Sequence, residues 1–253
     1  MRLLLVSISL IASLLLAGCY QDEEIITSDI VATIPWPDHE EADYALYDRD
    51  DRDLEEQLGS GILIVDKTGD QYEFQLNFEG EEGTDNTSVL VDAETLKPDF
   101  IRRDIQLEDE DAIIEGNYDH EAEVLTIKIT EDGNERTRPL RLNREHYYDN
   151  EEPLFIWRTI PFEIGYKANY NTVLANRGVI QGLTIEVKAR EEVTIPSGTF
   201  DAWRLEIGGE DGLHQVAWFA TAPDHRLLKY DNSIQLLVLT DYRGSSDVPA
   251  ATP

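Results

Sequence analysis

Alternation of apolar and polar side chains is the feature that most constrains what this chain of 253 residues can fold into. Within residues 71–78 every second side chain is apolar, namely Tyr72, Phe74, Leu76 and Phe78. Successive side chains of an extended strand point to opposite faces, so a period of two is typical of an antiparallel strand with one buried face. We therefore begin from a chain built mostly of strands.

Further segments extend this pattern along most of the sequence. Residues 123–130 alternate in the same way, and residues 202–207 place Trp203, Leu205 and Ile207 on one face. Turn residues separate further predicted strands at 60–66, 87–92, 100–107, 111–116, 135–142, 168–175, 181–194, 214–220, 226–231 and 234–242. The segment at residues 234–239 is almost continuously apolar, so we expect it to be covered on both faces.

Helical periodicity is scarce in this sequence. Residues 152–161 predict one short helix that ends at Pro161, with Leu154, Ile156 and Trp157 on its buried side. About a dozen strands cannot form a flat open sheet, since large sheets twist, curl or close. We predict a mainly β protein, a large curved antiparallel sheet or half-barrel with at most one or two short helices.

The N-terminal residues predict the location of the protein. An apolar run over residues 3–17 is shorter than the roughly 20 residues that a membrane-spanning helix needs, and it has the length of a secretory signal. The sequence Leu-Ala-Gly-Cys at residues 16–19 resembles the bacterial lipobox, in which the cysteine is acylated with chains such as palmitate. Cys19 is the only cysteine, and a free thiol behind a signal peptide is the alternative.

These features predict a lipid-anchored protein with an extracytoplasmic domain. We assign residues 1–18 to a lipoprotein signal peptide, 19–33 to the acylated Cys19 and a polar tether, 34–243 to a single β-rich domain, and 244–253 to a disordered tail. Tyr20 stands where an aspartate would be the usual inner-membrane retention signal, which favours the outer membrane if the cell is Gram-negative. Trp36, between two prolines, either caps the open end of the sheet or is exposed for a partner; we favour the cap.

The charge balance excludes one class of partner. The chain carries 52 Asp and Glu against 21 Lys and Arg, a formal charge of −31, which repels nucleic acid. Salt adaptation and cation binding by acidic loops both remain open as reasons for this charge. The acidic run at residues 48–53 does not fit a calcium loop, because Asp53 stands at the position of the obligatory glycine.

No pattern in the sequence predicts catalysis. The five histidines are scattered, no Gly-x-Ser-x-Gly elbow or glycine-rich nucleotide loop occurs, and the single cysteine is assigned to the anchor. We predict that the protein is not an enzyme and has no metal or cofactor. A hydrolase that uses carboxylates on the concave face is the alternative, and two or more buried acidic residues that converge in one pocket would favour it.

Several segments resemble a family of bacterial envelope proteins known as domain of unknown function 3108. Residues 187–206 are similar to its strand, proline-glycine turn and strand signature, and residues 91–98 to its "V-D-x-x-T-L-x-P" segment. Residues 217–220 with 227–230, and residues 158–162 with Gly165, resemble two further parts. The family is distantly similar to the LolA/LolB-type carriers, whose half-barrel holds acyl chains. That similarity implies a curved sheet and allows a hydrophobic ligand.

The functional prediction that follows is a non-catalytic binding or assembly role in the cell envelope. The partner would be either a lipid-like ligand held in the curved sheet or an envelope protein. A purely structural or protein-interaction domain is the alternative. A carrier requires a cavity of roughly 300–1,000 Å³, whereas a structural domain is expected to be packed solid.

Overall fold

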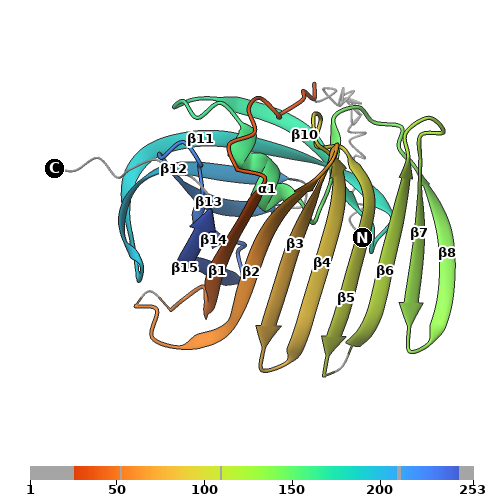
Figure 1. The fold of residues 1–253 in the computed structure, drawn as a ribbon, viewed down its shortest axis with the longest axis horizontal. Helices are drawn as coiled ribbons and strands as arrows, with labels where there is room; N and C mark the ends of the chain where they lie inside the picture. The colour runs from red at the N-terminus through yellow and green to blue at the C-terminus, as the bar shows by residue number, and fades with distance from the viewer. Residues whose placement is uncertain (1–25, 52, 109, 210–211, 245–253) are drawn as a thin grey trace, which may run out of the picture.

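The computed structural model describes residues 26–51, 53–108, 110–209 and 212–244, and these form one fifteen-stranded sheet (Figure 1). The predicted signal peptide and Cys19 lie outside the described residues, as does the predicted tail beyond Gly244. Eight strands form an antiparallel meander in chain order: β1 (His39–Asp48), β2 (Gln57–Thr68), β3 (Gln71–Gly80), β4 (Gly83–Asp92), β5 (Pro98–Leu107), β6 (Glu110–Asp119), β7 (Val124–Glu131) and β8 (Asn134–Arg141).

The remaining strands form the other half of the sheet. They are β9 (Tyr147–Asp149), β10 (Lys167–Leu174), β11 (Val179–Ile195), β12 (Gly198–Gly209), β13 (His214–Ala220), β14 (Leu227–Asp231) and β15 (Gln235–Gly244). The last strand, β15, pairs with the first, β1, so the two halves join in the middle of the sheet. All pairs are antiparallel except β9 with β10. The predicted curved sheet is confirmed.

The core lies on the concave face and follows the predicted alternation. On β3, Tyr72, Phe74 and Leu76 are buried, and they alternate with partly exposed polar side chains. Leu236 to Leu239 are all buried, as expected for a segment covered on both faces. Ile234, just before β15, is exposed instead.

Two strands were not predicted from the sequence. In β1 the inward positions include Glu40, which is 3 % exposed, so the apolar period begins late in this strand. β9 has only three residues, too few to show a period. On β12, Leu205 and Ile207 are buried as predicted, but Trp203 is only half-buried.

A short helical segment occupies the hollow between the two halves of the sheet (Figure 1). It consists of the helix α1 (Pro153–Ile156) and the 3-10 turn η1 (Trp157–Thr159). Every residue from Pro153 to Ile160 is buried, so the predicted helix is present but is buried all round. Neither helical element in the described part of the chain is long and apolar enough to cross a membrane.

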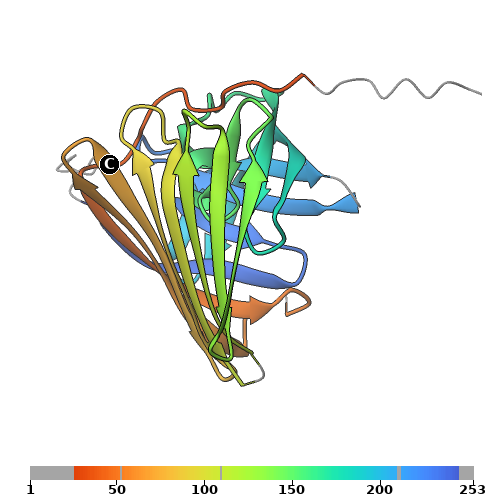
Figure 2. The ribbon, with the colours of Figure 1, turned by 90° about the vertical axis from the view of Figure 1, so that its right-hand side faces the viewer.

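The N-terminal segment closes one end of the hollow, running along the top of the domain in Figure 2. Trp36 is buried and packs edge-on against Tyr72 and Phe74, so the predicted cap is confirmed. Residues 26–33, which the sequence assigns to the tether, also pack on the domain. Ile30 is 1 % exposed, and the amide of Ser28 donates to the carbonyl of Asn169.

Side chains bridge the gap where the sheet does not close. Arg138 on the edge strand β8 donates to the carbonyls of Ala175 and Asn176, in the turn between β10 and β11. Gly178 in the same turn has φ +65°, and a Cβ there would lie 2.7 Å from the guanidinium carbon of Arg138. The edge strand also contains Pro139, which cannot donate to a further strand.

Candidate functional site

The end of the hollow opposite Trp36 contains a cavity of about 1010 Å³. Its wall combines the ends of β3 and β10 with the starts of β2, β11 and β15, and α1 and η1 contribute to its lining. The apolar part of this lining includes Leu76, Phe78, Leu154, Trp157, Leu174 and Leu183. The apolar face of β3 is therefore divided, since Tyr72 and Phe74 pack under Trp36 while Leu76 and Phe78 line the cavity.

Trp157 is held rigidly at the helical side of this cavity. Its indole nitrogen donates to the hydroxyl of Tyr170 at 2.9 Å, and its ring meets that of Tyr230 edge-on. Behind it, Phe155 stacks on Phe74 with ring centroids 4.5 Å apart. These contacts fix α1 and η1 against both halves of the sheet, so the helical segment is a fixed wall of the cavity.

An arginine with two carboxylate partners stands between this cavity and a second one of about 300 Å³. Arg103 on β5 forms a bidentate pair with Asp85, at 2.9 and 2.6 Å, and also bonds Glu151 at 3.0 Å. Asp85 and Arg103 line both cavities. Burial raises the pKa of Glu151, and the Arg103 charge opposes that change.

Two further carboxyl groups are fully buried at the start of α1. Asp149 accepts a hydrogen bond from the hydroxyl of Tyr118, and the carboxylate of Glu152 accepts the amide of Asp149. Burial, with a smaller contribution from the Glu151 charge, raises the pKa of Asp149 to about 7. Burial also raises the pKa of Glu152 well above its ordinary range, and one of its oxygens has no hydrogen-bond partner among the described residues.

The buried carboxyl groups do not converge in the cavity. Asp149 and Glu152 do not line it, whereas Asp85 and Glu151 line it but are both bonded to Arg103. Within the described residues, no group of three or more His, Cys, Asp or Glu side chains is arranged to hold a metal ion.

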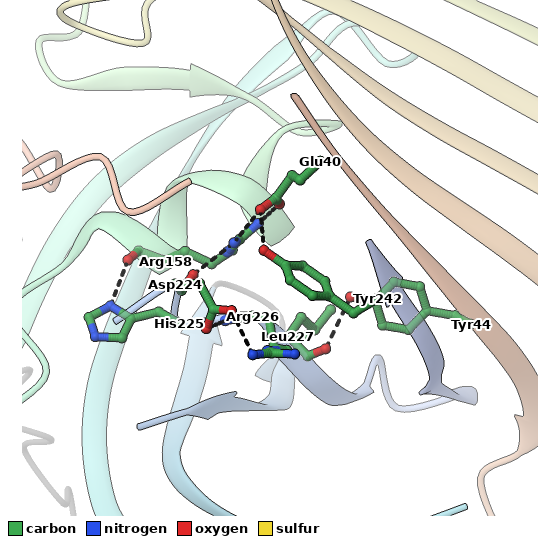
Figure 3. Close-up of polar contacts among 8 residues, drawn as sticks. All are labelled: Glu40, Tyr44, Arg158, Asp224, His225, Arg226, Leu227 and Tyr242. Carbon is green, nitrogen blue, oxygen red and sulfur yellow. Dashed lines mark hydrogen bonds and ion pairs between the residues drawn. The ribbon is translucent and has the colours of Figure 1, made fainter. Parts of the chain in front are cut away.

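A second polar cluster links η1 to β1, to β15 and to the loop before β14, where the two halves of the sheet join (Figure 3). Arg158 in η1 pairs with Glu40 of β1, and both side chains are about 95 % buried. Arg158 also donates to the carbonyl of Asp224 at 2.7 Å, and Tyr242 of β15 donates to Glu40 at 2.7 Å. Burial, the largest single effect, lowers the pKa of Arg158, but the charge and hydrogen bonds of Glu40, together with Tyr242 and Tyr44, outweigh it and raise that pKa.

Most residues singled out from the sequence have structural positions. Trp36 and Trp157 are buried, as expected. Trp218, which the sequence places on a strand, is half-buried on the face of β13 opposite the fully buried Ala217 and Phe219. Its indole donates to Glu191, and Lys229 lies over its ring. Cys19, the one predicted site residue, lies outside the described residues, so its acylation stays a prediction.

Sequence reasoning missed the buried acidic residues. The spacing Asp149-x-x-Glu152 just before Pro153 is that of a capping box, in which two side chains bond each other's backbone amides at a helix start. Glu151 donates its amide to Asp149 while Asp149 donates its amide to Glu152. This spacing was the available signal, but the reciprocal box is not formed. Asp149 accepts the amide of Glu151 instead of that of Glu152, and the N-cap of α1 is Glu152, which has no side-chain cap hydrogen bond.

Comparison with known proteins identifies one matching family model and three solved structures that align with this chain. A family model described as a protein of unknown function, DUF3108, matches residues 43–241. A search of curated proteins finds no match to this chain. Among solved structures, a β-barrel-like protein of the domain of unknown function DUF1849 from Brucella abortus aligns with a TM-score of 0.48 and 13% identity, covering 87% of this chain and 100% of that one.

Two other solved structures align less closely. A candidate exported protein of YmcC-like fold from Bacteroides fragilis has a TM-score of 0.31 and 11% identity. A candidate lipoprotein from Parabacteroides distasonis has a TM-score of 0.34 and 12% identity. Each alignment covers 85% of this chain and 100% of the other.

Proposed function

Because this chain belongs to the DUF3108 family, whose description assigns no activity, we propose that it is an extracytoplasmic binding domain for an apolar or amphipathic molecule. The observation that carries the proposal is the cavity of about 1010 Å³ at the end of the hollow opposite Trp36. Ligand cavities have volumes of roughly 300–1,000 Å³ and are lined mainly by apolar groups with a few polar ones. A purely structural domain would instead fill its hollow with side chains.

The position of the N-terminal segment supports a lipid-anchored form of this domain. Asn169, at the start of β10, contacts Ile26 and Ser28, whereas Thr172 and Leu174, further along the same strand, line the cavity. Five residues of strand span roughly 17 Å. Ile26, the first described residue, thus lies on the side of the domain away from the cavity, and an anchor at Cys19 would precede it in the chain. Palmitate labelling that depends on Cys19 tests the anchor, and persistence of the label in Cys19→Ala contradicts it.

The hydrogen-bond partners and positions of the acidic side chains near the cavity favour a binding role over a carboxylate-based hydrolase. Hydrolysis by two carboxyl groups needs one to donate a proton and the other to activate water or attack. Both oxygens of Asp85 and one oxygen of Glu151 are bonded to Arg103, so these two carboxylates are held by an ion pair instead of facing a bound molecule freely. Asp149 and Glu152 lie behind the wall.

Binding of a neutral apolar fluorophore tests the proposal. The full chain carrying Cys19→Ser, which keeps it free of acyl groups and detergent, is titrated with N-phenyl-1-naphthylamine. We expect saturable binding of one molecule. Leu174→Trp, which fills part of the cavity, is expected to weaken binding by about tenfold, equivalent to about 1.4 kcal/mol.

The matched control is Leu90→Trp. Leu90 is half-buried like Leu174, but it lies on the opposite face of β4 from the core residues Val89 and Val91 and does not line the cavity. We expect this variant to bind the fluorophore like the parent chain. Absence of saturable binding, or equal affinity of Leu174→Trp and Leu90→Trp, contradicts the proposed function.

A further inference from the structure

The mouth of the cavity is strongly acidic. Four glutamates line it from the start of β2 and from the hairpin between β3 and β4, namely Glu56, Glu79, Glu81 and Glu82. All four are exposed, and none has an ion-pair partner among the described residues. Among the Lys and Arg side chains that line it, Arg177 is the one likewise without an ion pair in the described part of the chain, and the imidazole of His214 also lines the cavity. A charged group that enters the cavity therefore passes mainly negative charge.

The deeper arginine does not reverse this balance. Arg103 is bonded by two carboxylates, Asp85 and Glu151, and its side chain is 23% exposed. A third anion would have to displace one of these partners or share the guanidinium with both. An incoming carboxylate or phosphate thus gains little from Arg103 and is repelled at the mouth.

The wall also offers one buried hydrogen-bonding group. Thr172 lies on the same face of β10 as Leu174, lines the cavity and is 2% exposed. Its hydroxyl has no hydrogen-bond partner among the described residues. Buried polar groups are nearly always paired, because an unpaired one loses its hydration without compensation. A polar atom on a molecule seated against β10 would satisfy it.

From these three observations we propose that the cavity selects a cationic amphiphile, with its apolar body between Leu76, Leu174 and Trp157 and its positive end among the glutamates of the mouth. The inference rests on the proposed binding function and adds the charge of the ligand to it. Opposite charges near a protein surface attract modestly and are screened by salt. The selectivity is therefore electrostatic and falls as ionic strength rises.

Three probes of equal chain length separate charge from apolar burial. Dodecylammonium, dodecanol and dodecanoate are titrated below their micellar concentrations against bound N-phenyl-1-naphthylamine, on the full chain carrying Cys19→Ser. At low salt we expect dodecylammonium to bind about tenfold more tightly than dodecanoate, with dodecanol between them. Near 0.5 M salt, where the Debye length is about 4 Å, the three affinities should converge.

Paired triple variants separate the mouth from the net charge of the protein. Glu79→Gln, Glu81→Gln and Glu82→Gln together should reduce the preference for dodecylammonium over dodecanoate to about twofold and leave dodecanol unchanged. The control carries Glu94→Gln, Glu121→Gln and Glu192→Gln, three exposed glutamates that do not line the cavity. Since it removes the same number of charges, it should keep the preference of the parent chain.

Each result bears on a different proposal. Displacement by all three probes with no preference for the cation, or with a preference for dodecanoate, overturns the cationic selectivity and leaves the binding function intact. Equal loss of preference in both triple variants assigns the effect to net charge and also overturns the inference. Failure of every probe to displace the fluorophore contradicts the proposed binding function itself.

Discussion

The pair of Glu40 and Arg158 is an unusual use of charged residues in a chain whose charges are mostly at the surface. Both side chains are buried, and the pair is completed by Tyr242 and the carbonyl of Asp224 (Figure 3). Removal of one member of a buried ion pair leaves the other charge without compensation. The energetic consequence is therefore expected to be far larger than that of an exposed pair.

Replacement of Arg158 by leucine is the first prediction. We expect Arg158→Leu to lower the free energy of unfolding by about 3–5 kcal/mol, because Glu40 stays buried without its partner. Arg190→Leu is the matched control, since its pair with Asp201 has both side chains more than half exposed, and should cost less than about 1 kcal/mol. Urea unfolding followed by circular dichroism measures both, and equal costs would contradict the predicted role of burial.

The same residue explains a limit of sequence reading. Alternation predicted the face of β3 because its inward residues are apolar, but the inward Glu40 of β1 is charged. Its partner Arg158 is distant in the sequence, and only the fold brings the two together. A polar side chain in a buried position carries no local signal of the pairing that allows it to be there.

The helical segment is the element whose environment was least predictable. Residues 152–161 were expected to bury one side, yet Leu154 and Trp157 face the cavity region while Phe155 stacks on Phe74. A surface helix shows an apolar stripe, whereas one surrounded by sheet is apolar all round. With only four residues in α1, neither pattern can be distinguished from the sequence.

The start of this element predicts a pH dependence of stability. Folding raises the pKa of Asp149 from an ordinary 3.8 to about 7, so the unfolded chain loses this proton at lower pH than the folded chain. The stability contributed by the protonated group is complete below about pH 4 and is lost as the pH rises through about 7. The free energy of unfolding should fall over this interval through this residue.

Asp149→Asn removes the titrating group and tests this dependence. The difference in unfolding free energy between the variant and the parent chain should shift in favour of the variant by on the order of 2–4 kcal/mol between pH 4 and pH 8, since each tenfold change in proton affinity is worth about 1.4 kcal/mol. Asp92→Asn is the contrasting control. Its hydrogen bonds with Thr95 lower the pKa of Asp92, so its effect should appear as the pH falls below about 4. A pH-independent difference for Asp149→Asn would contradict the assignment.

For the whole molecule, the decisive feature is the pairing of β1 with β15. The strands predicted from alternation and turns account for most of the sheet, but their order could not be read from the sequence. Pairing between neighbours in the chain is signalled by short turns, as at Glu81 and Glu82. No local feature signals that Glu40 lies opposite Gly244. The cavity could not be predicted either, because it depends on how completely side chains from both halves fill the hollow.

Truncation tests the importance of this central pair. Removal of residues 234–253 deletes β15 and with it the buried Leu236, Leu237, Val238 and Leu239. We expect this chain to lose cooperative urea unfolding and near-ultraviolet circular dichroism, since β1 and β14 both lose a neighbour. Removal of residues 245–253 alone is the control and should leave both signals unchanged. Cooperative unfolding of the shorter chain would contradict the role assigned to β15.

The pairing of the first strand with the last also determines when the sheet can be completed during export. A polypeptide that crosses a membrane as an extended chain, as the predicted signal peptide implies, delivers its N-terminal strands first. β1 can pair with β2 at once, but its other edge has no partner until the final strand arrives. Such non-local pairing is slow to form. In a chain exported in this way, the pairing of the two halves would have to wait until β15 has crossed the membrane.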